Sequence, residues 1–256
     1  MLTFFIFPPL SYSALNHSIT QGQDDVAIQL AKIVNPLLFK EQNHHGDTPL
    51  HLAVWHQNHK TNEKDQAPIS REELIKVLTS SGSFNPIDSQ GRTPLHIAAI
   101  NNNSQAIHSL VNAFQNYQKN NSNEQEQSLE TILSSFCYSG LTPLLASIHH
   151  GNDEAFSALL LSGASLKDAD QRNGQNSIMY AAKLESLNII QEMVKSSQWD
   201  VGHLKLKDFS GNTALHHAVL CNNIPMISYL LQIGAGKNFL FYFSFPSFFL
   251  FLPFFF

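Results

Sequence analysis

Short apolar clusters at helical spacing recur along most of the chain, separated by polar segments rich in glycine, asparagine and aspartate. Within each cluster the apolar residues lie three or four positions apart, which places them on one face of a helix. The pattern predicts an all-α chain built from short helices. The clusters are Leu74/Ile75/Leu78, Ile107/Leu110/Val111, Phe156/Leu159/Leu160, Ile189/Ile190/Met193/Val194 and Ile227/Leu230/Leu231.

A similar nine-residue phrase precedes each of these clusters. It reads GDTPLHLAV from Gly46, GRTPLHIAA from Gly91, GLTPLLASI from Gly140, GQNSIMYAA from Gly174 and GNTALHHAV from Gly211. Glycine supplies a turn with positive φ, threonine caps the helix that follows, and proline suits the first helical position. The histidines at the third helical position are interpreted as hydrogen-bonding residues between repeats, not as ligands or bases; they are His51, His96 and His216.

The repeated phrase resembles the signature of the ankyrin-repeat family, whose period is ~33 residues. The resemblance implies an all-α solenoid of about five helix-turn-helix repeats with hairpin fingers and irregular apolar termini. The finger residues include Asp88, Asp168 and Asp208. A stack of this kind binds other macromolecules and brings no chemistry of its own.

Two insertions and one upstream helix interrupt this regularity. Residues 57–70 lengthen the first repeat between its helices. Residues 115–128 are rich in Asn and Gln and cannot bury apolar surface, so we expect them to be mobile. Residues 24–34 have amphipathic helical character. They are either the outer helix of an earlier repeat whose first half is missing or a capping helix.

Both ends of the chain differ from the middle, since more than half of the 19 phenylalanines fall after residue 238. Residues 1–13 and 237–256 are largely codable by pyrimidine-rich codons, and we interpret them as translated intron sequence. A signal peptide is disfavoured because no basic segment leads it. A membrane span is disfavoured by Pro246 and Pro253. The expected organisation is an unstructured leader at 1–13, a capping or partial repeat at 14–42, the repeat domain at 43–236 and the Phe-rich tail at 237–256.

Composition argues against several functions. The net charge of −5 provides no basic field for direct nucleic-acid binding or for an anionic membrane. The two cysteines form no spaced metal motif, which favours a reducing intracellular compartment. The adjacent histidine pairs point apart on a helix and make poor metal sites. With no nucleophile motif or phosphate loop, we expect no enzyme activity, no cofactor and no metal.

Several longer segments resemble the inhibitor-of-κB family in their order along the chain. They are Asn43–Val54, Ser128–Leu133, Tyr138–Asn152, Leu166–Ala182 and Lys205–Val219, and the last is most similar to the nuclear, atypical members of the zeta type. The resemblance implies binding of Rel/NF-κB transcription-factor dimers and regulation of transcription, in the nucleus or cytoplasm. The chain has fewer phrases than that family, and it lacks the paired-serine degron and acidic tail. These absences favour a nuclear co-regulator.

We expect partner-binding residues where side chains leave the stack. Trp55 is the leading candidate because exposed indoles are typical of interaction hot spots, although it would equally suit a place under the first insertion. A generic ankyrin adaptor or scaffold, or the ankyrin portion of a membrane-anchored protein, are the alternative functions. The expected finger residues are His45, Asp47, Gln90, Arg92, Asp170, Arg172, Phe209 and Asn212, and the expected inner-helix residues are Trp55, His56, Asn101, His149 and His150.

Overall fold

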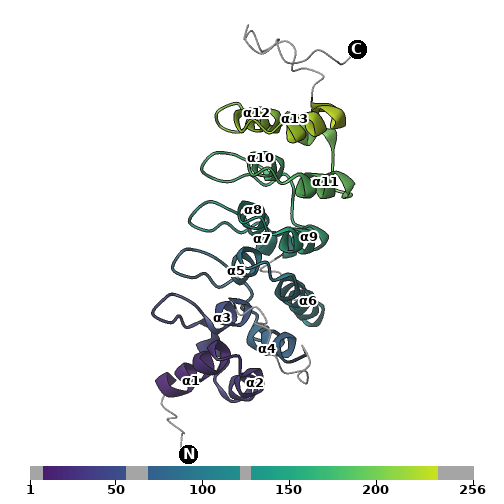
Figure 1. The fold of residues 1–256 in the computed structure, drawn as a ribbon. Coiled ribbons are helices and arrows are strands. Elements are labelled where there is room, and N and C mark those ends of the chain that lie inside the picture. The colour runs from purple at the N-terminus through teal and green to yellow at the C-terminus, as the bar shows by residue number, and fades with distance from the viewer. Residues whose placement is uncertain (1–7, 56–68, 122–127, 236–256) are drawn as a thin grey trace, which may run out of the picture.

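The computed structural model describes residues 8–55, 69–121 and 128–235, and these residues fold into a single file of helix pairs (Figure 1). In the described part of the chain the only β-type pairing is an isolated bridge between Ala169 and Asn176. The pairs are α1 (Pro8–Thr20) with α2 (Asp24–Ile33), α3 (Pro49–Trp55) with α4 (Ile69–Thr79), α5 (Pro94–Ile100) with α6 (Ser104–Asn120), α8 (Pro143–His149) with α9 (Asp153–Leu161), α10 (Ser177–Lys183) with α11 (Leu187–Lys195), and α12 (Ala214–Leu220) with α13 (Ile224–Leu230).

Short helical turns connect some of these pairs. They are η1 (Pro36–Lys40), α7 (Leu129–Leu133) and η2 (Val201–Lys205), and a further turn, η3 (Leu231–Ala235), follows the last pair. Every extensive contact between elements of the described chain is made within one pair or between neighbouring pairs. The first helices pack on one another in one layer, and the second helices form a parallel layer beside them (Figure 1). The predicted all-α solenoid is therefore confirmed.

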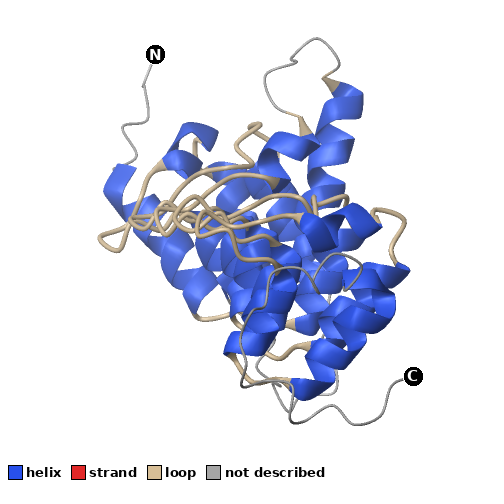
Figure 2. Ribbon diagram, turned by 90° about the horizontal axis from the view of Figure 1, so that it is seen from above, coloured by secondary structure: helices blue, strands red, loops and turns tan. Residues whose placement is uncertain are grey.

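The loops between pairs project from one side of the stack as fingers. Seen along the stack in Figure 2, these loops lie over one another beside the helices. In three pairs the predicted threonine or asparagine caps the first helix, because its side chain accepts a hydrogen bond from the backbone N–H three residues later. The capping residues are Thr93, Thr142 and Asn176.

The first helix pair differs from the sequence-based expectation. Helix α1 begins at Pro8, so residues 8–13 are helical and do not form an unstructured leader. It packs on both α2 and α3, and its Leu15 and Ile19 side chains are fully buried. Residues 24–34 are consequently the outer half of a unit whose inner half is present. The stack has one more helix pair than the five phrases indicate. Residues 1–7 and 237–256 lie outside the described residues.

The second insertion is also partly ordered, contrary to the expectation that residues 115–128 are mobile. Helix α6 continues to Asn120. Its last turns are held by Tyr117, whose ring lies 5.3 Å from that of Phe84, while Phe84 meets Phe114 edge-on at 5.0 Å. A single tyrosine therefore supplies apolar contact that the polar composition obscures. Residues 56–68 and 122–127 lie outside the described part of the chain.

The finger glycine is required by close contact as well as by its backbone angle. Gly46 has φ +85°, and a Cβ added there would lie 2.5 Å from the backbone nitrogen of Ser89 in the next finger. Gly151 has a similar φ of +69° at the turn between α8 and α9, but an added Cβ would meet nothing within 4 Å. At Gly46 glycine is needed both for its positive φ and for lack of space, whereas at Gly151 it is needed for its positive φ alone.

We predict that Gly46→Ala destabilises the protein more than Gly151→Ala. A left-handed residue with a side chain costs roughly 1–2 kcal/mol at either position. The clash with Ser89 adds a further ~1–3 kcal/mol at Gly46 alone. Urea denaturation followed by circular dichroism measures both losses, and equal losses would show that neighbouring fingers do not approach each other in this way.

Candidate functional site

Neighbouring fingers are joined by hydrogen bonds from one tip to the next. Between the first two fingers the Ser89 hydroxyl donates to the His45 carbonyl at 2.8 Å, and backbone hydrogen bonds join the later ones. The N–H of Tyr138 donates to the carbonyl of Gln90 at 3.0 Å, and that of Phe209 donates to Asn173 at 2.8 Å. Between them, the Gln171 N–H donates to the Gly140 carbonyl at 3.0 Å. The tips therefore form a continuous edge along one side of the stack, which we call the finger edge; its tip residues are 44–45, 89–90, 138–139, 171–173 and 209–210.

In four of the five fingers a side-chain acceptor at the base fixes the turn from inside; the third finger has Cys137 at this position, and its Sγ lies 2.8 Å from the Ser139 hydroxyl. The Asp88 carboxylate accepts hydrogen bonds from the backbone N–H groups of Gln90 and Arg92, both at 2.8 Å. Asn43 does the same in the first finger, and Asp208 in the last. In the fourth finger the acceptor is Asp170, two positions after Asp168. Such caps pre-form the turn before any partner arrives.

Asp170 was expected to bind a partner, and the structure corrects this expectation. Its side chain is buried, with 2% of the residue exposed. It accepts hydrogen bonds from the N–H groups of Arg172 and Asn173 at 2.8 and 2.5 Å, and from the Tyr180 hydroxyl at 3.2 Å. Because these donors occupy both oxygens, Asp170 organises the finger from beneath and presents no atom to a partner.

Arg92 is also engaged within the stack. Its guanidinium donates to the buried Asp88 carboxylate at 2.7 Å. Burial raises the pKa of Asp88, but hydrogen bonds from the backbone and guanidinium of Arg92 outweigh burial and leave that pKa below its ordinary value. Asp47 and Asn212 are half-buried, and their backbone N–H groups are bound by Asn43 and Asp208. These three predicted residues therefore lie at the finger bases.

Four of the predicted finger residues do lie on exposed tips. His45, Gln90, Arg172 and Phe209 are all exposed, and Phe209 has 75% of its surface accessible. Its ring covers Gly174 of the preceding unit, where an added Cβ would lie 2.6 Å away. The aromatic ring is thus positioned by the stack while one face remains open to solvent.

Tyr138 is a tip residue that the sequence analysis did not select. It is 67% exposed, and its ring lies over Gly91 in the way that Phe209 lies over Gly174. Both aromatic residues stand two positions before the finger glycine. Comparing the phrases at that position would have identified Tyr138 as the counterpart of Phe209.

The predicted residues on the inner helices lie at the C-terminal ends of α3, α5 and α8, whereas the fingers lead into the N-terminal ends of these helices. Trp55 is 51% exposed, and the Asn101 amide of the next unit lies 3.5 Å from its carbonyl oxygen. His149 and His150 are exposed neighbours with rings 5.3 Å apart. Burial and then His149 lower the pKa of His150. His56 lies outside the described residues, so its place stays a prediction.

The histidines of the phrase join neighbouring units. His51 Nε2 lies 2.9 Å from the carbonyl of Arg92, and His96 Nε2 lies 3.0 Å from that of Leu141. On the other side of each ring, Nδ1 accepts from the N–H of the capping threonine, which assigns the proton to Nε2. Burial lowers the pKa of His51 and keeps its ring neutral. The bridging role predicted for these two histidines is confirmed.

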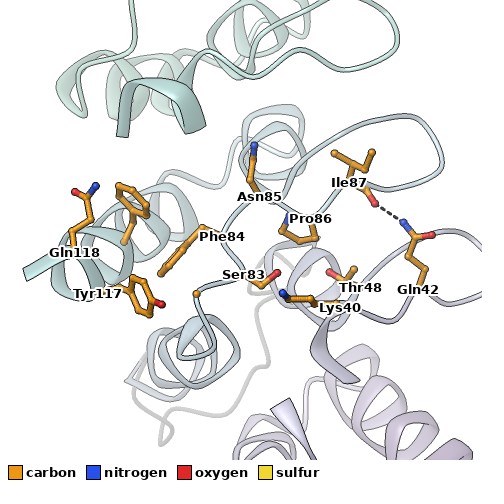
Figure 3. Close-up of a pocket in the computed structure, with 12 residues that line it drawn as sticks. Lys40, Gln42, Thr48, Ser83, Phe84, Asn85, Pro86, Ile87, Tyr117 and Gln118 are labelled. Carbon is orange, nitrogen blue, oxygen red and sulfur yellow. Dashed lines mark hydrogen bonds between the residues drawn. The ribbon is translucent and has the colours of Figure 1, made fainter. Parts of the chain in front are cut away.

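A cleft of about 390 Å³ lies between the first two fingers and the end of α6 (Figure 3). Phe84 and Tyr117 form one wall, and Gln42 bonds the Ile87 carbonyl at the other end. Among the described residues no group of three or more His, Cys, Asp or Glu side chains could hold a metal ion. No described helix has the length and apolar character that a membrane crossing requires.

The stacked pairs, capped fingers and bridging histidines define a helical repeat protein that presents an extended edge. The family model for ankyrin repeats in three copies matches residues 67–170 and again residues 144–239. The chain therefore belongs to the ankyrin-repeat family, and its stack is a protein-interaction module.

Sequence identity to individual relatives is low. The chain is 24% identical over 218 residues to the B-cell lymphoma 3 protein homolog of Mus musculus, a match that spans 75% of this chain and 45% of the relative. It is 22% identical over 256 residues to NF-kappa-B inhibitor zeta of Bos taurus, spanning 88% of this chain and 32% of the relative. The chain thus spans less than half of the length of these relatives.

A solved structure has the same fold. The crystal structure of the ankyrin repeat domain of Bcl-3, described as a unique member of the IkappaB protein family, matches with a TM-score of 0.67. The match covers 86% of each chain at 21% sequence identity. At this identity the likeness establishes the arrangement of helices and fingers alone.

We predict that Asp170→Ala destabilises the protein while Asp168→Ala does not. Removing the Asp170 carboxylate leaves buried backbone donors without an acceptor, at a cost of about 2–4 kcal/mol. The Asp168 carboxylate accepts no hydrogen bond from a described residue, so its loss changes stability by less than ~0.5 kcal/mol. Thermal or urea unfolding of the two variants measures the difference. Equal stability of the two variants would show that the Asp170 carboxylate does not hold the fourth finger.

Proposed function

We propose that the chain is a non-enzymatic interaction module of the inhibitor-of-κB type, which binds Rel/NF-κB dimers and regulates their transcriptional activity. It acts inside the cell, in the nucleus or cytoplasm. The observation that carries the proposal is the ordered set of family-like segments from Asn43 to Val219. Similarity over most of the chain to a protein named NF-kappa-B inhibitor zeta supports it.

The geometry supports binding of a large folded partner more than binding of a small molecule. The finger edge runs along the whole file of helix pairs and is pre-formed by the Asp and Asn caps. A pre-organised surface loses little conformational entropy on association, which favours affinity. Exposed aromatic residues on it, Tyr138 and Phe209, have the character of interaction hot spots.

The proposal includes no catalytic step. The histidines that are most repeated in the chain are committed to structure, since His51 and His96 each bridge a threonine and the backbone of the next unit. Adjacent His149 and His150 rings are 5.3 Å apart and nearly perpendicular. These side chains are better suited to polar contacts with a partner than to proton transfer.

Direct binding to purified Rel homology dimers tests this function. We expect the full chain to bind with a Kd of about 1 μM or tighter, measured by calorimetry or biolayer interferometry. Phe209→Ala should weaken binding by about tenfold or more, because an aromatic anchor is lost from the finger edge. Leu161→Ala is the matched control, since Leu161 is 82% exposed but lies on the outer helix α9.

The absence of binding at about 10 μM would contradict the proposal and favour a general ankyrin adaptor or scaffold. Equal weakening by Phe209→Ala and Leu161→Ala would show that the partner does not use the finger edge. The far-UV circular dichroism spectrum is the check on folding, and it should be unchanged in both variants because neither side chain is buried.

A further inference from the structure

Exposed positive charge is concentrated on the last two fingers. Lys167 and Arg172 stand on the fourth finger, and Lys205 and Lys207 lead into the fifth; all four side chains are exposed. The first finger differs, because Glu41 and Asp47 are exposed or half-exposed there beside Lys40. The overall charge of −5 therefore conceals a local basic surface at the C-terminal end of the finger edge.

The carboxylates of these two fingers are turned inward. Asp170 and Asp208 are buried, with 2% and 7% exposed, and accept hydrogen bonds from the backbone of their own fingers. Asp208 also contacts the buried His217 ring at 2.9 Å. Asp168 remains half-exposed, and Asp200, five positions before Lys205, is exposed. In the described part of the chain, none of the five ion pairs includes any of the four cationic side chains.

Two of the cations also lie against the inner helices. Arg172 donates to the Tyr138 carbonyl at 3.0 Å. It also lies near Tyr180 on α10: burial and the Asp170 carboxylate raise the pKa of Tyr180, and the charge of Arg172 offsets part of that rise. Lys207 lies near His216 on α12, where burial, then His217 and then Lys207 lower the pKa of the imidazole. Arg172 and Lys207 therefore lie next to the exposed rings of Tyr138 and Phe209.

We propose that the finger edge from Tyr138 to Phe209 binds an acidic segment of a protein partner, with carboxylates at Arg172 and Lys207 and apolar side chains against the two aromatic rings. This deepens the proposed function and rests on it only for the partner being a protein. Charge complementarity favours an acidic segment, because Arg172 and Lys207 have no carboxylate partner among the described residues and a carboxylate of the segment would pair with each of them. The aromatic rings supply contact area that charge alone does not.

An acidic protein segment fits this surface better than a nucleic acid. Binding a phosphate backbone depends on many cationic contacts spread along its length. Here the basic surface is limited to two fingers, and the first finger carries exposed carboxylate that would repel phosphate. A short acidic segment with interspersed apolar residues matches both the extent and the chemistry of the edge.

Fluorescence anisotropy with the full chain tests the inference. The probe is a labelled 12-residue peptide of glutamate, glycine and two phenylalanines, and the comparison probes are the same peptide with lysine for glutamate and a 12-nucleotide single strand. We expect only the acidic peptide to bind, with affinity that falls as salt rises. Arg172→Gln/Lys207→Gln should weaken that binding about tenfold. The control Lys119→Gln/Lys195→Gln, which removes equal charge from exposed lysines on outer helices, should not.

Tighter binding of the oligonucleotide, no binding of the acidic peptide, or equal weakening by both double variants would overturn the inference. Rel homology dimers measured beside the peptide keep the two proposals apart. If the dimers bind and the peptide does not, the acidic-segment inference fails and the proposed function stands. If the peptide binds and the dimers do not, the proposed function fails and the inference stands.

Discussion

The close approach of each finger to the glycine of the finger before it is the constraint on which the rest of the structure depends. At Gly46 the next finger comes so near that a single methyl group would touch the backbone nitrogen of Ser89. Close approach of this kind lets neighbouring tips share hydrogen bonds and lets the phrase histidines reach the next unit. Since each unit of the described chain makes its extensive contacts with its neighbours, the helix pairs form one long surface.

The same constraint divides the finger residues into two groups. Acceptors that hold the turns, such as Asp88 and Asp170, are drawn beneath the tips and lose contact with solvent. Side chains at the tips, such as Tyr138 and Phe209, pack against a glycine of the preceding finger and remain exposed to solvent. Residues that hold the turns and residues that can contact a partner are therefore only one or two positions apart in the chain. Because these acidic residues are buried, the charge exposed on the fingers differs from the net charge of the sequence.

The sequence predicts the repeated unit well because its physical requirements are local. A turn glycine, a capping threonine and a bridging histidine act over a few residues, and the expected bridges of His51 and His96 are present. The inner helix of the first pair, α1, was missed because residues 8–20 do not carry the repeated phrase, and its place depends on Leu15 and Ile19 packing against α2 and α3. The exposure of Asp170 was mispredicted for a related reason: three backbone donors and Tyr180 converge on it only after the finger folds.

Amide hydrogen exchange at the finger tips tests the cross-finger bonding most directly. The N–H groups of Tyr138, Gln171 and Phe209 lie in exposed loop residues, where exchange would ordinarily be rapid. Because each donates to the neighbouring finger, their exchange should be slowed by about 100-fold or more relative to the unfolded chain. Exchange of all three within about tenfold of the unfolded rate would mean that the fingers move independently, and the account of one pre-formed edge would be wrong.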